Sequence, residues 1–170
     1  MASDERIPLY IVVDGDYNPL YIRLTKDPRK CTEFAYPVSR TMNLTLKNQT
    51  FTVQIRDHVS AKNYSSETEY YKEVEGVAVV YTVLDRDSFL RVPTLLNYIS
   101  RKASQAAVVL VGISTDLAGG REVTYCEGVQ LAEGLGVPFL ETAAKAAVNA
   151  DPAFVLLTTL VGLKQEVWTK

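Results

Sequence analysis

The sequence has few of the residues that mark disulfide-rich, metal-binding or nucleic-acid-binding proteins. Its 170 residues include two cysteines, Cys31 and Cys126, and a single histidine, His58. Two cysteines so far apart do not indicate a disulfide framework, and one histidine without a second ligand in its segment does not indicate a metal site. A net charge of −2, with no stripe of lysine or arginine, argues against a nucleic-acid partner. We therefore expect a protein of a reducing compartment without a metal.

Long apolar runs are also missing. We find no signal peptide and no membrane span, and residues 167–170 carry no prenylation motif. We expect either a cytoplasmic protein with no membrane anchor of its own, or a domain of a longer protein. The proportions of hydrophobic (47%) and charged (22%) residues are those of a globular protein. The length predicts a single domain over residues 1–170, with a core from about 8 to 166.

Strand and helix patterns alternate along the chain. Apolar, β-branched runs predict buried parallel strands at residues 9–13, 76–83, 107–112 and 137–140. Alternating residues around a turn at 47–49 predict an antiparallel hairpin of 41–46 with 51–55. Capping and periodicity signals predict helices at 20–26, 66–73 and 88–103, one from 124 to either Gly134 or Gly136, and another from 152 onward. The order predicts an α/β fold: a doubly wound, mostly parallel six-stranded sheet with one antiparallel edge strand and helices on both faces.

One predicted helix, 88–103, contains a proline. Its apolar face is expected to hold Leu90, Leu95, Leu96 and Ile99. Pro93 must either kink the helix or mark its true first turn.

The turn after the first strand is where nucleotide-binding α/β folds hold phosphate. Asp14, Gly15, Asp16 and Tyr17 form this turn. A phosphate cradle needs glycines, so that the backbone can approach closely, and a lysine for the outer phosphates. Here there is one glycine, no lysine and two carboxylates. Each carboxylate at ~4 Å from a phosphate would cost about 4 kcal/mol at a surface-like dielectric. The turn is therefore predicted to repel a triphosphate.

Two later segments resemble the guanine-recognition motifs of the Ras-like small GTPases. Residues 112–117, Gly-Ile-Ser-Thr-Asp-Leu, resemble the pattern Gly-Asn-Lys-x-Asp-Leu, and residues 141–145, Glu-Thr-Ala-Ala-Lys, resemble Glu-Thr-Ser-Ala-Lys. Residues 50–64 are similar to the third strand and second switch of the family. The resemblance covers about 9–161 and implies a Ras-like fold. It implies that Asp116, Ala144 and Lys145 occupy vestigial guanine-site positions, although the family's asparagine and lysine are lost before Asp116.

Fewer of the residues with which the family binds phosphate and magnesium are present in this sequence. It places Asp57 where the family holds magnesium through a water. Ser60 replaces the glycine whose amide meets the γ-phosphate, and Ala61 replaces the glutamine that positions the attacking water. Val38 stands where a magnesium-binding threonine is expected. These degenerate switch positions, with the degenerate phosphate loop at 14–16, imply no route to GTP turnover.

The sequence thus favours a pseudoGTPase domain similar to those within large Rho GTPase-activating proteins. This interpretation predicts a cytoplasmic, non-catalytic interaction or scaffolding module in small-GTPase or Rho signalling. It would bind proteins, hold neither GTP nor GDP, need no cofactor, and not be an enzyme. Tyr64, Tyr70 and Tyr71 could form an exposed aromatic interface, because tyrosine is favoured at interfaces. The other interpretation is that they cover the sheet edge.

Two alternatives stay open. The first is a GTP-binding Ras-like protein with weak or no hydrolysis. The second rests on Asp14 and Asp16, which resemble the Asp-x-Asp motif of haloacid-dehalogenase-type phosphatases, with Asp14 as nucleophile. A receiver-like domain using Asp57 and Lys145 as well is its regulatory variant. The lack of an acidic pair after a later strand, where Glu141 stands alone, counts against the phosphatase.

Overall fold

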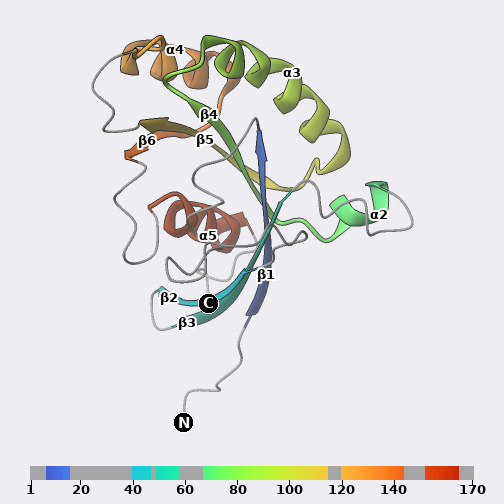
Figure 1. Cartoon of the computed structure of the whole chain (residues 1–170). Helices are drawn as coiled ribbons and strands as arrows, with labels where there is room; N and C mark the ends of the chain where they lie inside the picture. Colours follow the sequence, from blue (N-terminus) through green and yellow to red (C-terminus); the bar gives the residue numbers. More distant parts are fainter. Residues whose placement is uncertain are drawn as a thin grey trace, which may run out of the picture.

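The described strands form a single β-sheet (Figure 1). The candidate site lies at the carboxyl ends of its parallel strands. The computed structural model describes residues 7–15, 40–46, 49–57, 67–114, 120–143 and 152–164. The strands are β1 (Ile7–Gly15), β2 (Arg40–Leu46), β3 (Gln49–Asp57), β4 (Gly76–Thr82), β5 (Ala107–Ser114) and β6 (Phe139–Ala143). The helices are α2 (Glu67–Lys72), α3 (Arg86–Lys102), α4 (Tyr125–Leu135) and α5 (Pro152–Lys164). The helix predicted at 20–26 lies outside the described residues.

The strands lie in the order β2-β3-β1-β4-β5-β6. Strand β2 runs antiparallel to β3, and every other neighbouring pair is parallel. The predicted hairpin is confirmed, and its connection is tighter than expected because Leu46 pairs with Gln49. The predicted mixed α/β architecture, with a parallel sheet and helices, is also confirmed.

The sheet separates two hydrophobic clusters. Side chains on successive residues of a strand point to opposite faces, and β4 shows this clearly. Ala78 and Val80 belong to the cluster that contains Leu157 and Val161 of α5. Val77, Val79 and Tyr81 of the same strand belong to the cluster built with α2, α3 and α4. Figure 1 shows α5 on one side of the sheet and α3 and α4 on the other.

Three of the four residues predicted on the buried face of α3 are confirmed there: Leu96 and Ile99 are buried, and Leu95 is partly buried and packs on the same cluster. Phe89, Val92, Leu96 and Ile99 are buried, at the three- and four-residue spacing of one helix face. Leu90 is 61% exposed, so its predicted place on the buried face is wrong. The reason is that the helix begins at Arg86 and packs through Phe89, which turns Leu90 about 100° away from the sheet. Pro93 lies inside the helix and does not mark its first turn.

Helix α4 has the ends that the sequence predicts. Thr124 and Glu127 form a reciprocal capping box at its start. Gly136 ends it with a φ of 67°, a left-handed conformation in which a Cβ is unfavourable. This fixed start matters for function because α4 begins beside the candidate site.

Candidate functional site

The carboxyl ends of the parallel strands meet at one edge of the sheet, and the candidate site lies there. Strand β1 ends at Gly15, β3 at Asp57, β5 at Ser114 and β6 at Ala143. Ligands of open parallel sheets bind outside this edge. The sheet therefore brings the starting points of the predicted phosphate and guanine segments to one side of the molecule.

The guanine side begins on two neighbouring strands. Ser114 pairs with Ala143 in the β5–β6 register, and the Ser114 hydroxyl donates to the carbonyl oxygen of Thr142 at 3.4 Å. The predicted guanine-site residues follow these strand ends by one or two positions and lie outside the described residues: Asp116, Ala144 and Lys145. Their roles stay predictions, but the strands that lead to them are neighbours.

The phosphate side begins on β1 and β3. Val13 pairs with Asp57 across these strands, so Asp14 and Asp57 are placed at adjacent strand ends. Gly15 pairs with Val80 of β4. The other predicted residues of this side lie outside the described residues: Asp16, Val38, Ser60 and Ala61.

Arg121 and Glu141 join the segment before α4 to strand β6. Nη1 and Nη2 of Arg121 donate to the two carboxylate oxygens of Glu141 at 3.1 and 2.5 Å. The Glu141 side chain is 15% exposed and the Arg121 side chain 41% exposed, so the pair is partly open to solvent. Hydrogen bonding to Glu141 raises the pKa of the Arg121 guanidinium. Arg121 lies just before α4, whereas Glu141 opens the 141–145 motif, so the pair ties the segment before α4 to this motif.

The segment 121–124 is also hydrogen-bonded to the end of β4. The carbonyl oxygen of Val83 accepts from the backbone N–H of Glu122 at 2.8 Å and from that of Val123 at 3.1 Å. The N–H of Val83 in turn donates to Ile113 of β5 at 3.0 Å. The Val123 side chain is fully buried and anchors the segment in the core.

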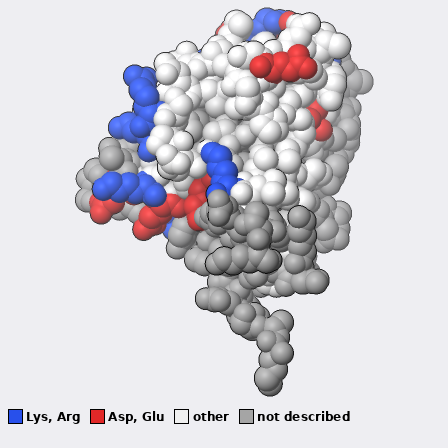
Figure 2. All heavy atoms as spheres, turned by 180° about the vertical axis from the view of Figure 1, so that it is seen from behind, with Lys and Arg blue, Asp and Glu red and all other residues white. Residues whose placement is uncertain are grey.

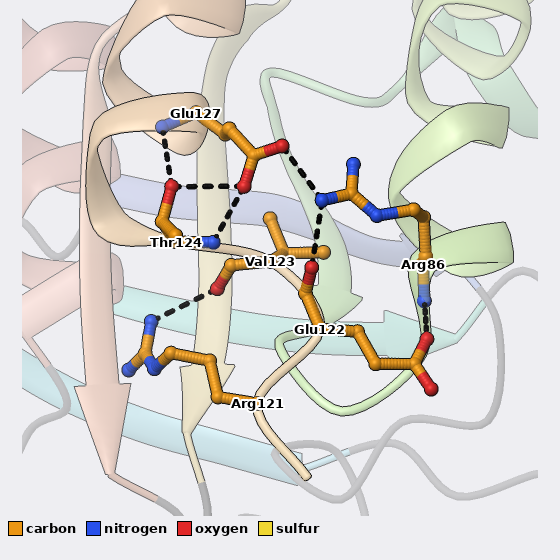
Figure 3. A network of polar contacts seen from close by, with 6 residues as sticks. All are labelled: Arg86, Arg121, Glu122, Val123, Thr124 and Glu127. Atoms are coloured by element: carbon orange, nitrogen blue, oxygen red, sulfur yellow. Dashed lines mark hydrogen bonds and ion pairs between the residues drawn. The ribbon is translucent and has the colours of Figure 1, made fainter.

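Arg86, the first residue of α3, contacts the same segment (Figure 3). Its backbone N–H donates to Oε2 of Glu122 at 2.8 Å. Its Nη2 donates to the carbonyl oxygen of Glu122 and to Oε1 of Glu127, both at 2.7 Å. One arginine thus connects α3 with both the segment before α4 and the first turn of α4.

Glu127 is the acidic centre of this network. Its Oε2 accepts from the backbone N–H and the hydroxyl of Thr124, each at 2.8 Å (Figure 3). The backbone bond from Thr124, then the bonds from Arg86 and from the Thr124 hydroxyl, lower the pKa of Glu127 to about 2. The carboxylate is therefore charged throughout the neutral range and holds its partners in place.

Sequence reasoning missed most of this network. It singled out the capping box of Thr124 and Glu127, because those two residues stand three apart. It did not single out Arg86, Arg121 or Glu122. The only local signal for them is that they are charged residues flanking predicted strand and helix ends, which many surface residues share.

The predicted aromatic interface is wrong for two of its three tyrosines. Tyr70 and Tyr71 of α2 are 0% and 1% exposed. Their rings meet edge to face with centroids 5.2 Å apart, and Tyr71 packs in the same way on Tyr98 of α3. The short helix α2 buries both rings in the cluster beneath α3, as the alternative interpretation expected. Tyr64 lies outside the described residues.

Two shallow apolar hollows lie at the opposite end of the sheet. One, of about 450 Å³, is lined by residues including Ala106, Val137 and Leu163. The other, of about 300 Å³, lies between α3 and α4. Both border Ala106, immediately before the first residue of β5, and not the carboxyl edge where ligands of such sheets bind.

Neither a metal centre nor a transmembrane helix is found in the described part of the chain. No three histidine, cysteine, aspartate or glutamate residues gather there in a way that could hold a metal ion. None of the described helices is long and apolar enough to cross a bilayer.

Comparison with known proteins identifies the class to which this sheet edge belongs. The sequence model described as "Ras family" matches residues 32–162, well over half of the chain. The chain therefore belongs to the Ras family, within the Ras-like small GTPase superfamily. The match starts later than the predicted resemblance, so the phosphate loop at 14–16 lies outside it.

Two named relatives agree with this assignment. The chain is 41% identical to the "Ras-related protein RIC1" of Oryza sativa subsp. japonica over 111 residues, which cover 64% of this chain and 55% of the relative. It is 39% identical to the "Ras-like protein 1" of Saccharomyces cerevisiae over 112 residues, covering 64% of this chain and 36% of the relative. The chain spans about half of the first relative and about a third of the second.

The prediction that the chain is not an enzyme is contradicted by this membership, because the Ras family consists of GTPases, which are hydrolases. The prediction was wrong because it judged catalysis largely from the loop at 14–16, which the family match does not include. Membership favours the GTP-binding alternative over the nucleotide-free interaction module. It also assigns the fold to GTPases and not to Asp-x-Asp phosphatases.

Proposed function

We propose that the chain is a guanine-nucleotide-binding protein of the Ras family that hydrolyses GTP slowly. The observation that carries the proposal is the Ras-family match over residues 32–162, which includes both segments that resemble guanine-recognition motifs. The Arg121–Glu141 pair holds the second of these segments, at its first residue, to the segment before α4. A base pocket built on two loops needs those loops held in register, since misplaced groups lose binding and orientation. Asp116, which keeps the carboxylate for the guanine N–H groups, lies between β5 and this pair in the chain.

Slow hydrolysis follows from the residues of the second switch. Ala61 stands where the family positions the attacking water with glutamine, and a methyl group cannot hydrogen-bond to water. The loop at 14–17 also offers no lysine to neutralise charge that develops on the phosphates. Base contacts therefore supply a larger share of the affinity than in a protein with a complete phosphate loop.

The proposal extends to the whole chain. We place one doubly wound Ras-like domain over residues 1–170, with its core at about 8–166, in the cytoplasm. Its macromolecular partner is a protein and not a nucleic acid. The net charge of −2 supports this choice, and the face shown in Figure 2 carries both basic and acidic side chains on a mostly uncharged surface.

Thermal melts with nucleotides test binding. A ligand at 100 times its dissociation constant adds about 2.7 kcal/mol of stability, which is several degrees in the midpoint for a chain of this size. GDP and GTP should raise the midpoint, and ATP should not. Asp116→Asn should abolish the GDP shift, whereas Asp87→Asn, an exposed aspartate of α3, should keep it. If millimolar GDP and GTP leave the wild-type midpoint unchanged, the proposal fails and a nucleotide-free module is the remaining interpretation.

Single-turnover hydrolysis tests the catalytic part. Wild-type protein loaded with GTP should release phosphate slowly but faster than free GTP does. Ala61→Gln should raise the rate by restoring a group that can orient water. A wild-type rate equal to that of free GTP, together with no gain in Ala61→Gln, would reject the hydrolysis proposal while leaving nucleotide binding intact.

A further inference from the structure

We propose that the two apolar hollows form one groove, which binds a segment of a partner protein that carries apolar and acidic side chains. This inference gives a place and a chemistry to the protein partner proposed above, and it does not depend on nucleotide binding. The two hollows share three lining residues, Ala106, Val108 and Val137. They are therefore neighbouring parts of a single groove, here called the amino-edge groove, which follows the starts of β5 and β6.

The amino-edge groove passes between the two layers of helices. Its smaller part is lined by Leu96 of α3 and Leu135 of α4. Its larger part is lined by Leu160 and Leu163 of α5. Because α3 and α4 cover one face of the sheet and α5 covers the other (Figure 1), the groove runs around the amino ends of β5 and β6 from one face to the other.

Apolar side chains remain uncovered along this groove. Val108, Val137 and Leu160 are only partly buried, although each packs on one of the two hydrophobic clusters. Leu163 is 54% exposed, one of three large hydrophobic side chains that are exposed among the described residues. An exposed apolar patch of this kind marks an interaction site. A small-molecule site encloses most of its ligand, so two shallow hollows in a row are better matched by a protein segment that places one apolar side chain in each.

The charge of the groove selects the polar side chains of that segment. Lys164 is the only charged residue among the described lining residues, none of which is acidic. Its ammonium donates to the carbonyl oxygens of Gln105 at 3.3 Å and Ala106 at 3.1 Å. Both partners are neutral, and no described carboxylate pairs with this lysine. The larger hollow therefore has a positive charge at its wall that nothing described neutralises.

A second cation lies near the smaller hollow. Arg101 directly follows the lining residue Ser100, and its Nε donates to the carbonyl oxygen of Asn97 at 3.3 Å. No described carboxylate pairs with Arg101 either. Interfaces match potentials of opposite sign, so a carboxylate beside the apolar side chain in either hollow is favoured, and a basic segment is disfavoured.

A library of random short peptides displayed on phage tests this inference. Wild-type protein is the bait, and Leu163→Asp is the counter-bait that removes peptides bound elsewhere. The enriched peptides should contain two apolar residues and at least one aspartate or glutamate. The most enriched peptide is then synthesised, and its dissociation constant is measured for wild type and each variant.

The variants separate apolar contact from charge. Leu163→Asp should weaken peptide binding at least about tenfold, because it removes an apolar contact and sets a carboxylate against an acidic peptide. The matched control Leu90→Asp, at a similarly exposed leucine that lines neither hollow, should bind as wild type does. Lys164→Met should weaken binding about threefold and reduce its dependence on salt. Lys164→Arg should keep both the affinity and the salt dependence.

The inference is overturned if no enriched peptide depends on Leu163, or if the enriched peptides are basic or uncharged. Wild-type dimers that Leu163→Asp dissociates in sedimentation would assign the groove to a second copy and overturn it too. So would peptide binding gained only when residues 165–170 are removed, which would assign the groove to the chain itself. Melting without peptide identifies any variant that is misfolded. Nucleotide-induced melting shifts should be the same in Leu163→Asp and wild type, so failure of this inference and failure of the proposed nucleotide binding are told apart.

Discussion

Arg121 and Glu141 form a two-bond ion pair across 20 residues of sequence, with Nη1–Oε2 and Nη2–Oε1 distances of 3.1 and 2.5 Å. Arg121 also donates from Nη1 to the carbonyl oxygen of Val123 at 3.1 Å. The guanidinium therefore bridges the entry to α4 and the middle of β6. Two-bond arginine–carboxylate pairs fix orientation as well as distance.

The first prediction concerns the coupling energy of this pair. Arg121→Ala and Glu141→Gln should each lower the free energy of unfolding, and the double variant should lose less than the sum. A partly exposed pair of good geometry should show a coupling of about 1 kcal/mol. Urea denaturation of the four proteins measures it. Strictly additive losses would show that the two side chains do not stabilise one another.

The second prediction concerns Tyr81. Its side chain is fully buried, and its hydroxyl has no hydrogen-bond partner among the described residues. The hydroxyl fits only because residues 112 and 128 are glycines, at which a Cβ would lie 2.8 and 2.5 Å from it. An unpaired buried hydroxyl costs about 1–3 kcal/mol. Tyr81→Phe should therefore raise the melting temperature by about 2–4 °C per kcal/mol regained.

An alkaline titration checks the same residue independently. Burial, then the charge of Glu141, raises the pKa of Tyr81 to about 12 from an ordinary 10.0. Between those values the unfolded chain loses the proton first, so this tyrosine makes stability fall as pH rises above 10. The variant Tyr81→Phe should not show this part of the loss of stability above pH 10. Tyr125→Phe, at an exposed site, should still show it. An equal alkaline loss in wild type and Tyr81→Phe would contradict the assignment.

The third prediction is the acid dependence of the network around Glu127. The pKa of Glu127 is lowered from 4.5 to about 2, so the folded state favours the carboxylate. Its stabilising contribution is complete above about pH 4.5 and disappears as pH falls toward 2. Glu127→Gln should lower the melting temperature at pH 7, and the gap from wild type should close across that acid range. Glu133→Gln, on an exposed position of the same helix, should show no such closing gap.

The fourth prediction concerns Pro93, which is exposed and lies inside α3. Proline has no N–H to donate to the carbonyl of Phe89 one turn earlier, and its ring crowds that carbonyl. Pro93→Ala should stabilise the protein by about 2 kcal/mol. This is the free energy gained from a better helix-forming residue, reduced because alanine leaves the unfolded chain more conformational freedom than proline does. Thermal or urea unfolding measures it against Thr94→Ala, the neighbouring exposed site. A loss of stability would indicate that the proline ring makes contacts that matter more than the missing bond.

Local sequence patterns were enough to predict most of the helices and strands. The capping box of Thr124 and Glu127 was predictable because both partners lie within one turn. The strand at 76–83 was predictable because a continuous apolar run is typical of a buried parallel strand, and the hairpin was predictable because its residues follow the two-residue period of a strand. The burial of Tyr70 and Tyr71 was not predictable, because a helix as short as α2 has too few turns for its periodicity to identify the buried face.

The candidate site was predictable only in its motifs. The ion pairs of Arg86 and Arg121 join residues 20–41 positions apart, and such pairs depend on where the sheet places its strand ends. The loop at 14–17 misled the functional prediction for a related reason. The missing lysine concerns only this short loop, whereas the evidence that the chain belongs to a GTPase family comes from the sequence of the much longer segment 32–162.

The alternation along β4 has a consequence for how the molecule comes apart. Ala78 and Val80 are packed on the side of α5, while Val77, Val79 and Tyr81 are packed on the other side. Because the same few peptide groups support both layers, neither layer can melt without releasing the other. The amide protons of β4 should exchange with deuterated solvent only through complete unfolding, and one cooperative transition should suffice to describe it.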